Sequence, residues 1–487
     1  MPDGKSNNII RKAARNKKYM LALVAGFLFL TASLFFLAAG NYLILLLPVF
    51  LLLILIAFLS IDKFFLILLF AVPLSVQLRF LVNDPPANLY LPTEIMAFII
   101  LIIMIYKLVG SREYDRKLLT RHVSIIVLIM LFWMLVTSLT GELTGVSLKY
   151  FLARLWFVSA FYFLALELFR KRGFIKKAVL AYMAGMVPVV IYNIVNLYRS
   201  GLFNQRAAHS SMDPFFNDHT SFGAALAFLI PVCIWFVYKA SPGIKRIIYL
   251  MMLLIFIAGI VFSYSRAAWI SLFAGIFFGV LMLLKISWRV TIPSAILTFF
   301  IIVMMWPSIV IKLNDINQRS SGNMAEHLGS VANISSDDSN MERINRWKCA
   351  LKMGAEKPLT GWGAGSYQFL YAPYQLSHDR TSISTNFGTR GNAHSEYLGA
   401  FAETGIPGAV IFILLVVFAI AAGLRAWDKN TDQRYLVLAL LCGLISYVIH
   451  GALNNFLDTD KIAALFWMYI AALVTLKDRA TNKPSLQ

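Results

Sequence analysis

Charged side chains are scarce in this sequence. Asp, Glu, Lys and Arg together account for only 14% of its 487 residues, whereas a typical soluble domain carries about a quarter. Hydrophobic residues account for 59%, and many apolar runs reach the roughly 20 residues that cross a bilayer as a helix. The alternating segments of a transmembrane barrel are absent. The composition excludes an ordinary soluble protein and predicts an all-α polytopic integral membrane protein.

Cysteine is also rare. The three cysteines are Cys233, Cys349 and Cys442, and two of them lie inside apolar runs. The sequence contains no CxxC pair and no Cys/His spacing typical of zinc. The single loop cysteine has no second cysteine in its own loop. We therefore expect neither a disulfide framework nor a zinc site.

Acidic residues are outnumbered, and the formal net charge is +20. Such an excess could indicate a nucleic-acid partner. Here, however, the basic residues lie in short loops between apolar runs, where the positive-inside rule places them on the cytoplasmic side. Contacts with anionic headgroups of membrane lipids account for the remaining charge, so no nucleic-acid partner is expected.

Fourteen apolar runs are candidate membrane spans, and since their boundaries are soft we expect about 12–14 transmembrane helices. The runs lie at 19–39, 42–60, 64–82, 91–109, 122–140, 148–169, 176–198, 219–239, 245–263, 267–285, 290–311, 396–423, 433–453 and 460–476. The basic N-terminus resembles a signal peptide, but the first run is too long for a cleaved one. The predicted organisation is a cytoplasmic tail, N-terminal spans, one large extracytoplasmic loop, C-terminal spans and a second cytoplasmic tail, at 1–18, 19–311, 312–395, 396–476 and 477–487.

The loops support this topology. With the N-terminus inside, every second loop is rich in Lys and Arg, whereas the outer loops 83–90 and 141–147 contain neither. Both termini are therefore predicted to be cytoplasmic. The long loop 312–395 then falls outside the cell, with a polar first part and an aromatic second part that suggest a flexible lid and a small folded subdomain.

Four of the basic residues that fall on this outer side are candidates for the site. They are Arg206, Arg266, Arg346 and His394. Arg266 stands in a short outer turn, where it either snorkels to the interface or binds an anion, since the rigid arginine fork suits phosphate. Arg206 permits the same two interpretations, and Arg346 could instead form a salt bridge on an amphipathic helix. Two or three such arginines could hold a diphosphate without a metal.

His394 stands where the long loop enters a span, followed by Glu396 and Glu403 and then by a helix interruption at 405–408. A histidine here could be structural, or it could accept a proton from a sugar hydroxyl. Glu94 and Arg154 lie within spans, where charges either serve function or pair with each other.

Metal signals are weak. Asp458-Thr-Asp460 matches the short DxD pattern of sugar-nucleotide transferases, and His209, His219 and Asp213 could mimic a metal cluster. Neither spacing is specific. The glycine-rich run 361–365 lies in the outer loop, where no nucleotide is available, so it is interpreted as a turn. We expect no metal and no cofactor.

Three motifs give the chain a family resemblance. They are Ser263-Tyr-Ser-Arg-Ala-Ala-Trp-Ile270, Arg346-Trp with Pro358-Leu-Thr-Gly-Trp-Gly-Ala-Gly365, and Asn392-Ala-His-Ser-Glu-Tyr-Leu398 followed by Glu403-Thr-Gly-Ile-Pro-Gly408. Together they cover roughly residues 200–410. In this order, spacing and common membrane side they resemble the O-antigen ligase and polysaccharide polymerase family of bacterial membrane glycosyltransferases, which implies a GT-C-like fold.

The resemblance implies an enzyme that moves a glycan from an undecaprenyl diphosphate carrier to a glycan or lipid acceptor, without metal or nucleotide sugar and with inversion. Arg266 matches the family's diphosphate-binding arginine. Arg206 is the candidate for the second one, with Arg199 as its competitor. His394 matches the histidine that activates the acceptor hydroxyl. We expect a supporting role for Arg346, and also for Glu396 and Arg154.

The implied location is the bacterial inner or plasma membrane, with the active site outside the cytoplasm. Whether the acceptor makes the enzyme a ligase or a polymerase stays open, and a slight preference for polymerase rests on how such folds are most often used. The alternative is a flippase for lipid-linked oligosaccharides. A transporter would place polar residues near the bilayer midplane and break helices at corresponding positions of two halves; this sequence shows no internal repeat. A nonenzymatic assembly or sensor protein is a further alternative.

Overall fold

The computed structural model describes residues 31, 47–81, 89–111, 114–286, 338–377, 380, 384, 391–429 and 433–481. The chain divides into two units. The first, Met1–Phe64, includes α2 (Leu47–Leu59), and α3 (Ile61–Ala71) begins at its end. The second, Phe65–Gln487, contains every other element and all of the candidate site residues. Everything that follows concerns the second unit.

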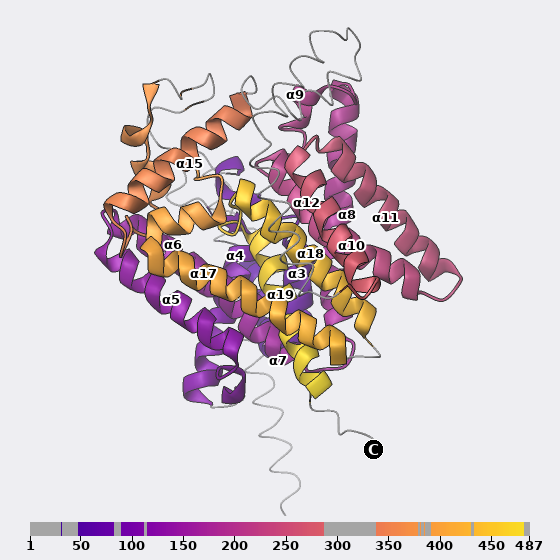
Figure 1. Cartoon of the computed structure of the whole chain (residues 1–487). Coiled ribbons are helices and arrows are strands. Elements are labelled where there is room, and N and C mark those ends of the chain that lie inside the picture. Colours follow the sequence, from indigo (N-terminus) through magenta and orange to yellow (C-terminus); the bar gives the residue numbers. More distant parts are fainter. Residues whose placement is uncertain are drawn as a thin grey trace, which may run out of the picture. The chain divides into compact units, whose positions relative to one another are not determined.

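The second unit is built almost entirely from helices (Figure 1). Its N-terminal half contains α4 (Thr93–Ile105), η3 (Tyr106–Gly110), η4 (Arg116–Leu118), α5 (His122–Thr140), α6 (Thr144–Val158), η5 (Ser159–Leu164), α7 (Ala165–Phe169), α8 (Phe174–Ser200), α9 (Gln205–Ala208), α10 (His219–Lys239), α11 (Ile244–Phe262) and α12 (Arg266–Leu283). Its C-terminal half contains α15 (Asp338–Glu356), α16 (Tyr367–Leu370), η6 (Ala372–Tyr374), α17 (Glu396–Lys429), α18 (Arg434–Leu453) and α19 (Asp460–Thr481). One short antiparallel pair joins β1 (Val76–Gln77) to β2 (Tyr90–Leu91), and η2 (Leu78–Phe80) follows β1.

Nine helices in the described ranges are long and apolar enough to cross a membrane. They are Thr93–Gly110, His122–Thr140, Thr144–Phe169, Phe174–Ser200, His219–Lys239, Ile244–Phe262, Arg266–Leu283, Glu396–Asp428 and Arg434–Leu453. Each coincides with a predicted span to within a few residues, which confirms a multi-pass helical membrane protein. The expected spans 19–39, apart from Thr31, and 290–311 lie outside the described residues, as does most of the first part of the loop 312–395.

One predicted span differs from the structure, and another forms a helix that is enclosed by other helices. In the run 64–82 the α-helix is short, since α3 stops at Ala71 because Pro73 cannot continue the backbone hydrogen bonding and disfavours helix before it. The buried side chains of Ser75 and Gln77 then follow in the turn and β1. The run 460–476 forms α19, but every residue of it is buried. α19 is thus enclosed by other helices, among them α10, α17 and α18.

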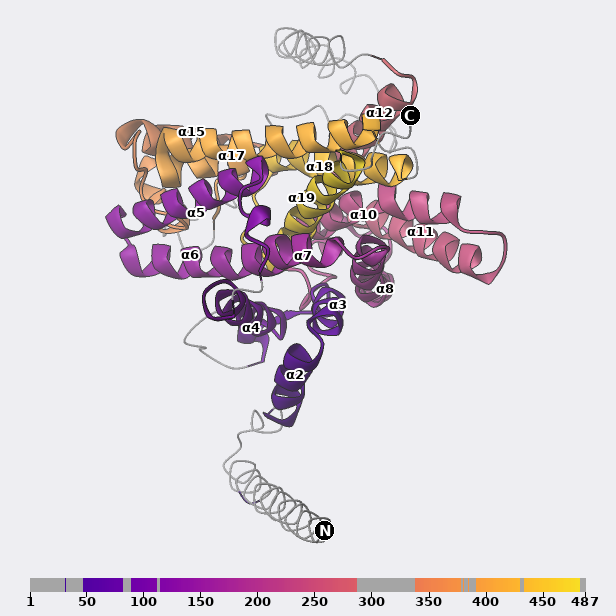
Figure 2. The same ribbon diagram turned by 90° about the horizontal axis from the view of Figure 1, so that it is seen from below.

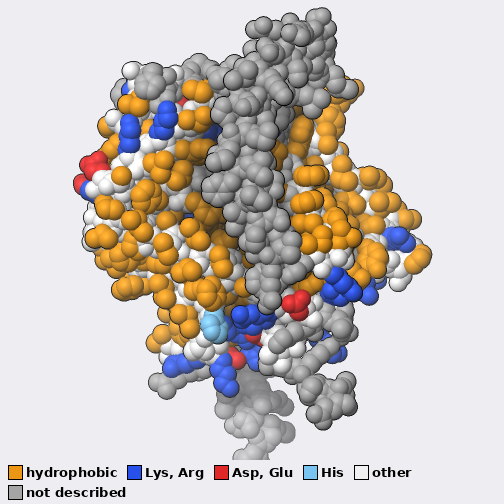
Figure 3. Space-filling view, viewed as in Figure 1, with side chains coloured by type: hydrophobic (Ala, Val, Ile, Leu, Met, Phe, Trp, Pro, Cys, Tyr) orange, Lys and Arg blue, Asp and Glu red, His pale blue; other side chains and the backbone are white. Residues whose placement is uncertain are grey.

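The packing of the long helices brings distant segments of the chain together. α12 and α10 both pack along α18, and α5 packs along both α6 and α17 (Figures 1 and 2). Gly275 and Gly443 permit this closeness, because a Cβ at either position would meet the backbone of the neighbouring helix. Hydrophobic side chains dominate the ungreyed part of the face in Figure 3, and most Lys and Arg side chains there lie along its lower edge.

The aromatic second part of the long loop forms its own small core. α15 lies beside the start of α17 (Figures 1 and 2). Buried between them and α16 are Cys349, Ala350, Met353, Tyr367, Tyr371, Ala393 and Ala402. This core fixes the segment that leads into His394.

Candidate active site

An open pocket of about 1090 Å³ lies where five separate segments meet. It is lined by Tyr90, Phe216, Asn217, Asp218, Ser221, Glu342, Arg346, Gly391, Asn392, His394, Asn455, Phe456, Asp458, Thr459 and Lys461. These residues come from β2, the start of α10, α15, the approach to α17 and the connection from α18 to α19. We call this space the polar pocket. It brings together two of the predicted residues, His394 and Arg346.

The backbone around His394 is held by its own motif. Asn392 accepts a hydrogen bond from the His394 N–H at 3.1 Å, and Trp347 Nε1 donates to the His394 carbonyl at 3.0 Å. His394 adopts a φ of +48°, which is uncommon for a residue with a side chain and marks a position held by its surroundings. Ser395 then accepts from the N–H of Leu398 at 3.3 Å in the first turn of α17. The motif thereby fixes the backbone that carries the imidazole.

The electrostatics of the pocket keep His394 neutral. Removal from water lowers the pKa of the imidazole to about 4, and the positive charges of Arg343 and Arg346 act in the same direction. The hydrogen bond with Asn454 and the charge of Asp218 oppose this shift. A histidine with this pKa is unprotonated at neutral pH, so one ring nitrogen has a free lone pair, and it is a weaker base than a histidine in water.

Arg346 is buried, with only 3% of its surface exposed. Its Nε donates to Glu342 Oε1 at 2.5 Å, one helical turn earlier on α15, and its guanidinium lies 4.0 Å from the centre of the Tyr371 ring. The salt bridge that the amphipathic pattern allowed is therefore present, but in a buried setting where it is held firmly. Gly391 packs directly against the guanidinium, because a Cβ at this position would overlap it.

Arg266 opens α12 from a tight turn built by serines. Ser263 Oγ accepts from the N–H of Ser265 at 3.2 Å, and Ser265 Oγ caps the helix by accepting from Ala268 N at 3.3 Å. This turn packs against Gly223 in the first turns of α10, close to Asp218, which caps α10 and lines the polar pocket. Arg266 itself does not line the pocket in the described part of the chain.

The second candidate arginine stays a prediction. The backbone of Arg206 belongs to α9, but its side chain lies outside the described residues. Its competitor Arg199 is exposed near the C-terminal end of α8. Tyr264 ties this region to the α12 turn, since its hydroxyl donates to the Leu202 carbonyl at 3.1 Å.

Glu396 and Arg154 line a neighbouring pocket of about 670 Å³ rather than the polar pocket. Glu396 Oε1 accepts from the N–H groups of Phe456 and Leu457 at 2.8 and 3.0 Å. Arg154 donates to the Leu457 carbonyl at 2.6 Å and to Tyr150 at 2.9 Å. Both side chains thus hold the connection from α18 to α19 in place. Their supporting role stays a prediction.

Glu94 and Arg154 each have a partner of their own instead of forming the ion pair that the sequence allowed. Glu94 Oε1 accepts from the Tyr90 N–H at 3.2 Å. The hydrogen bonds of Arg154 run to the carbonyl and hydroxyl groups named above.

The interruption of α17 at Gly405 lies in contact with the glycine-rich run 361–365. Gly405 breaks α17 with φ 70°. At this kink Ile406 N donates to the Pro358 carbonyl at 2.7 Å, and Gly363 N donates to the Glu403 carbonyl at 2.9 Å. The Glu403 carboxylate accepts from the N–H groups of Gly365 and Tyr367 at 2.9 and 3.1 Å. The run 361–365 is therefore a turn, as expected, and Glu403 holds it on α17.

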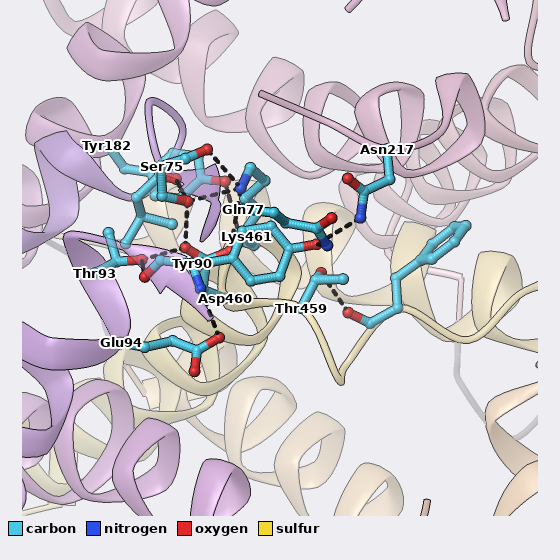
Figure 4. Close-up of polar contacts among 12 residues, drawn as sticks. Ser75, Gln77, Tyr90, Thr93, Glu94, Tyr182, Asn217, Thr459, Asp460 and Lys461 are labelled. Carbon is cyan, nitrogen blue, oxygen red and sulfur yellow. Dashed lines mark hydrogen bonds and ion pairs between the residues drawn. The ribbon is translucent and has the colours of Figure 1, made fainter. Parts of the chain in front are cut away.

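The two aspartates of the DxD pattern lie in different surroundings. Asp460 is fully buried and accepts from Ser75 at 2.5 Å, from Thr93, and from Lys461 at 3.2 Å (Figure 4). Asp458 lines the polar pocket. His219 donates to Asp218 at 3.1 Å and stacks on His209. Among the described residues, no group of three or more His, Cys, Asp or Glu side chains could hold a metal ion.

Several residues of the polar pocket were not predicted from the sequence. Lys461 donates to Ser75 at 2.7 Å and lies 4.2 Å from the centre of the Tyr90 ring. The Tyr90 hydroxyl in turn accepts from Gln77 and Asn217, each at 2.7 Å (Figure 4). The Asp218 carboxylate has a pKa well below its usual range, since hydrogen bonds from His219 and Thr220 outweigh the effect of burial. The contacts of Lys461 and Tyr90 join segments far apart in the sequence, so their spacing does not reveal them, whereas those of Asp218 are local to the start of α10.

Comparison with known proteins adds one match. Residues 250–413 match the family model described as O-antigen ligase. The matched range includes the α12 turn with Arg266, the described part of α15 and the motif around His394, but not Arg206 or the connection from α18 to α19. No curated protein matches the chain.

Proposed function

We propose that this chain, whose residues 250–413 match the O-antigen ligase family model, is a multi-pass glycosyl-transferring enzyme of polysaccharide synthesis that uses an undecaprenyl-diphosphate-linked glycan as donor. The acceptor is a sugar hydroxyl of another glycan or of a lipid. The reaction proceeds with inversion and without a metal ion. The active site lies in and beside the polar pocket.

The observation that carries this proposal is the state of His394. Its imidazole lines the open polar pocket and is unprotonated at neutral pH. A neutral histidine beside an acceptor hydroxyl is a suitable general base. Its backbone is fixed by Asn392 and Trp347, so the ring is held in place before substrate arrives.

The proposed chemical step is a single displacement. The acceptor oxygen attacks the anomeric carbon of the donor while His394 takes the hydroxyl proton. The bond from the anomeric carbon to the diphosphate oxygen breaks, and its electron pair stays on the diphosphate. Arg266 and Arg206 stabilise the charge that develops there, while Arg346, fixed by Glu342, contributes positive charge in the lining of the pocket.

The basic ends of the helices support the proposed orientation. Lys239, Lys245, Lys285, Arg425 and Arg434 all lie at the ends of their helices remote from Asp218, Arg266 and His394. The positive-inside rule places that end in the cytoplasm. The polar pocket then faces outward, with both chain termini inside, at the inner or plasma membrane of a bacterium.

A reconstituted system tests the proposal. Proteoliposomes receive a polyprenyl-diphosphate-linked repeat unit as the only substrate, and the length of carrier-linked product is followed on a gel. A ladder that disappears with His394→Ala would establish a polymerase that depends on His394. Transfer that requires an added lipid acceptor would establish a ligase. His122→Ala is the matched control and should transfer like the parent, because His122 begins α5 beside Arg425, at the helix ends remote from the polar pocket.

Two outcomes oppose the proposal. Full transfer by His394→Ala would show that His394 is not the general base. Movement of the substrate to the other leaflet, with no transfer under either condition, would instead support the flippase alternative.

A further inference from the structure

A single amide connects two histidines at the edge of the polar pocket. Asn454 Oδ1 lies 3.4 Å from His394 Nδ1, and Asn454 Nδ2 lies 3.2 Å from His450 Nε2. Asn454 ends α18 and is 1% exposed, and His450, one turn earlier on the same helix, is fully buried. The chain of contacts therefore runs from the interior of the protein to the ring of His394.

The chemistry of the amide makes this bridge directional. A carbonyl oxygen only accepts hydrogen bonds and an NH₂ group only donates them. Since Asn454 presents oxygen to His394, the His394 ring must donate from Nδ1. Its neutral form then carries the proton on Nδ1 and the lone pair on Nε2. His450 must in turn accept on Nε2, which fixes its own tautomer.

The amide cannot rotate freely. The Asn454 N–H donates to the His450 carbonyl at 3.0 Å, which ties the backbone of Asn454 to the last turn of α18. The His450 ring packs against the rings of Tyr447 and Phe456, with centroids 6.3 and 5.8 Å away. Reversing the amide would place NH₂ toward Nδ1 and would require both histidines to change tautomer.

We propose that Asn454 is a positioning residue that, backed by His450, holds His394 in the tautomer with Nε2 as the proton-accepting atom. The inference rests on the proposed role of His394 as general base. It adds two residues that lie outside the matched family range and that no sequence motif indicated.

The charges around His394 set the expected pH behaviour. Arg343, Arg346 and Glu342 face it from α15, Asp218 from the start of α10, and Asp458 and Lys461 from the connection to α19 and its first turn. In all variants considered next these groups stay unchanged. Any difference between a variant and the parent in the pH dependence of kcat/KM then results from the changed contact between residue 454 and His394.

Asn454→Asp tests the proposal with almost no change of shape. A carboxylate that accepts from Nδ1–H stabilises the protonated ring, as an opposite charge in contact usually raises a pKa by about 1–3 units. His450 can meet the second carboxylate oxygen by taking its other tautomer. The acidic limb of the kcat/KM profile should therefore move upward by about 1–3 pH units, and kcat at high pH should be retained to within about tenfold.

Asn217→Asp is the matched control. It places the same charge in the same pocket but without contact with the His394 ring, so its acidic limb should move by much less. Asn454→Ala should lower kcat by about 10- to 1000-fold, up to the usual worth of a general base, with a smaller change in donor KM.

The outcomes are separable. If His394→Ala is inactive but Asn454→Asp leaves the acidic limb in place, the positioning role is wrong and the proposed function stands. If His394→Ala remains active, the proposed function fails first. If Asn454→Ala does not fold, Asn454→Asp and His450→Gln still decide the matter, because a glutamine that offers Oε1 to the Asn454 amide should preserve most of the activity.

Discussion

Gly391→Ala should disable the site through a single added methyl group. Gly391 lies against the Arg346 guanidinium so closely that a Cβ would overlap it. The end of an arginine is normally easy to move. Here it is buried, bonded to Glu342 at 2.5 Å and stacked 4.0 Å from the centre of the Tyr371 ring. The methyl group must therefore either displace the guanidinium or push the backbone away from α15.

The size of the effect follows from the two possible responses. Overpacking a closed site costs about 1–3 kcal/mol, and leaving one member of a buried ion pair uncompensated costs about 3–5 kcal/mol. We expect a loss of about 2–4 kcal/mol, seen as a fall of several degrees in the Tm of the purified protein. The rate of glycan transfer should fall by more than the loss of folded protein explains, because Gly391 and Arg346 line the same pocket as His394.

A double-mutant cycle separates this mechanism from a general disturbance. In Arg346→Ala the guanidinium is absent, so adding Gly391→Ala should cost little more. Gly399→Ala is the matched control, because its nearest neighbours would lie 3.6 Å from the new methyl group, an ordinary contact. Additive losses in the double variant, or a parent-like Gly391→Ala, would refute the reasoning.

Four further results are expected. Arg266→Lys should lose most transfer, because a point charge cannot replace the two-pronged fork, whereas Arg246→Lys at the opposite membrane face should not; equal activity of the two would argue against a bidentate diphosphate contact. Glu403→Gln should lower stability by about 1–3 kcal/mol, because one amide oxygen must replace two carboxylate oxygens that each accept a backbone N–H; in a thermal unfolding assay the exposed control Glu142→Gln should be neutral. The pKa of the His394 imidazole is about 4 in the folded protein and 6.5 in the unfolded chain, so the unfolded chain binds more protons between these pH values. The contribution of His394 to stability is therefore present above pH 6.5 and is lost as the pH falls toward 4. The same loss of stability in a His394→Gln variant would show that another group causes it. A chelator should leave transfer unchanged, and a strict metal requirement would return attention to the DxD pattern.

Local patterns in the sequence predicted the features that depend on local chemistry. Span boundaries followed apolar runs, and the serine-rich turn before Arg266 became a capped helix start. The Glu342 and Arg346 spacing produced the salt bridge that the pattern allowed. These features need only neighbours within a few residues.

The contacts that complete the site are not local. Asn454 and His394 are 60 positions apart, and Ser75 and Asp460 are 385 apart. Asn454 resembles any residue that ends a helix, and Lys461 resembles any basic residue beside a span. Only the folded structure brings Asn454 to His394, and Lys461 to Ser75 and Tyr90. The same fold turned the two aspartates of the DxD pattern toward different surroundings.

The break in α17 also separates two mechanical environments. Residues Glu396–Thr404 are tied to the turn 358–365 and to the connection before α19, whereas the segment beyond Gly405 exposes Ile406, Val410, Ile413, Leu414 and Val417. Helices facing lipid change their tilt when bilayer thickness changes. Because a change in the tilt of the segment beyond Gly405 can be absorbed at Gly405, we expect the spacing of the groups around His394 to depend little on the thickness of the membrane.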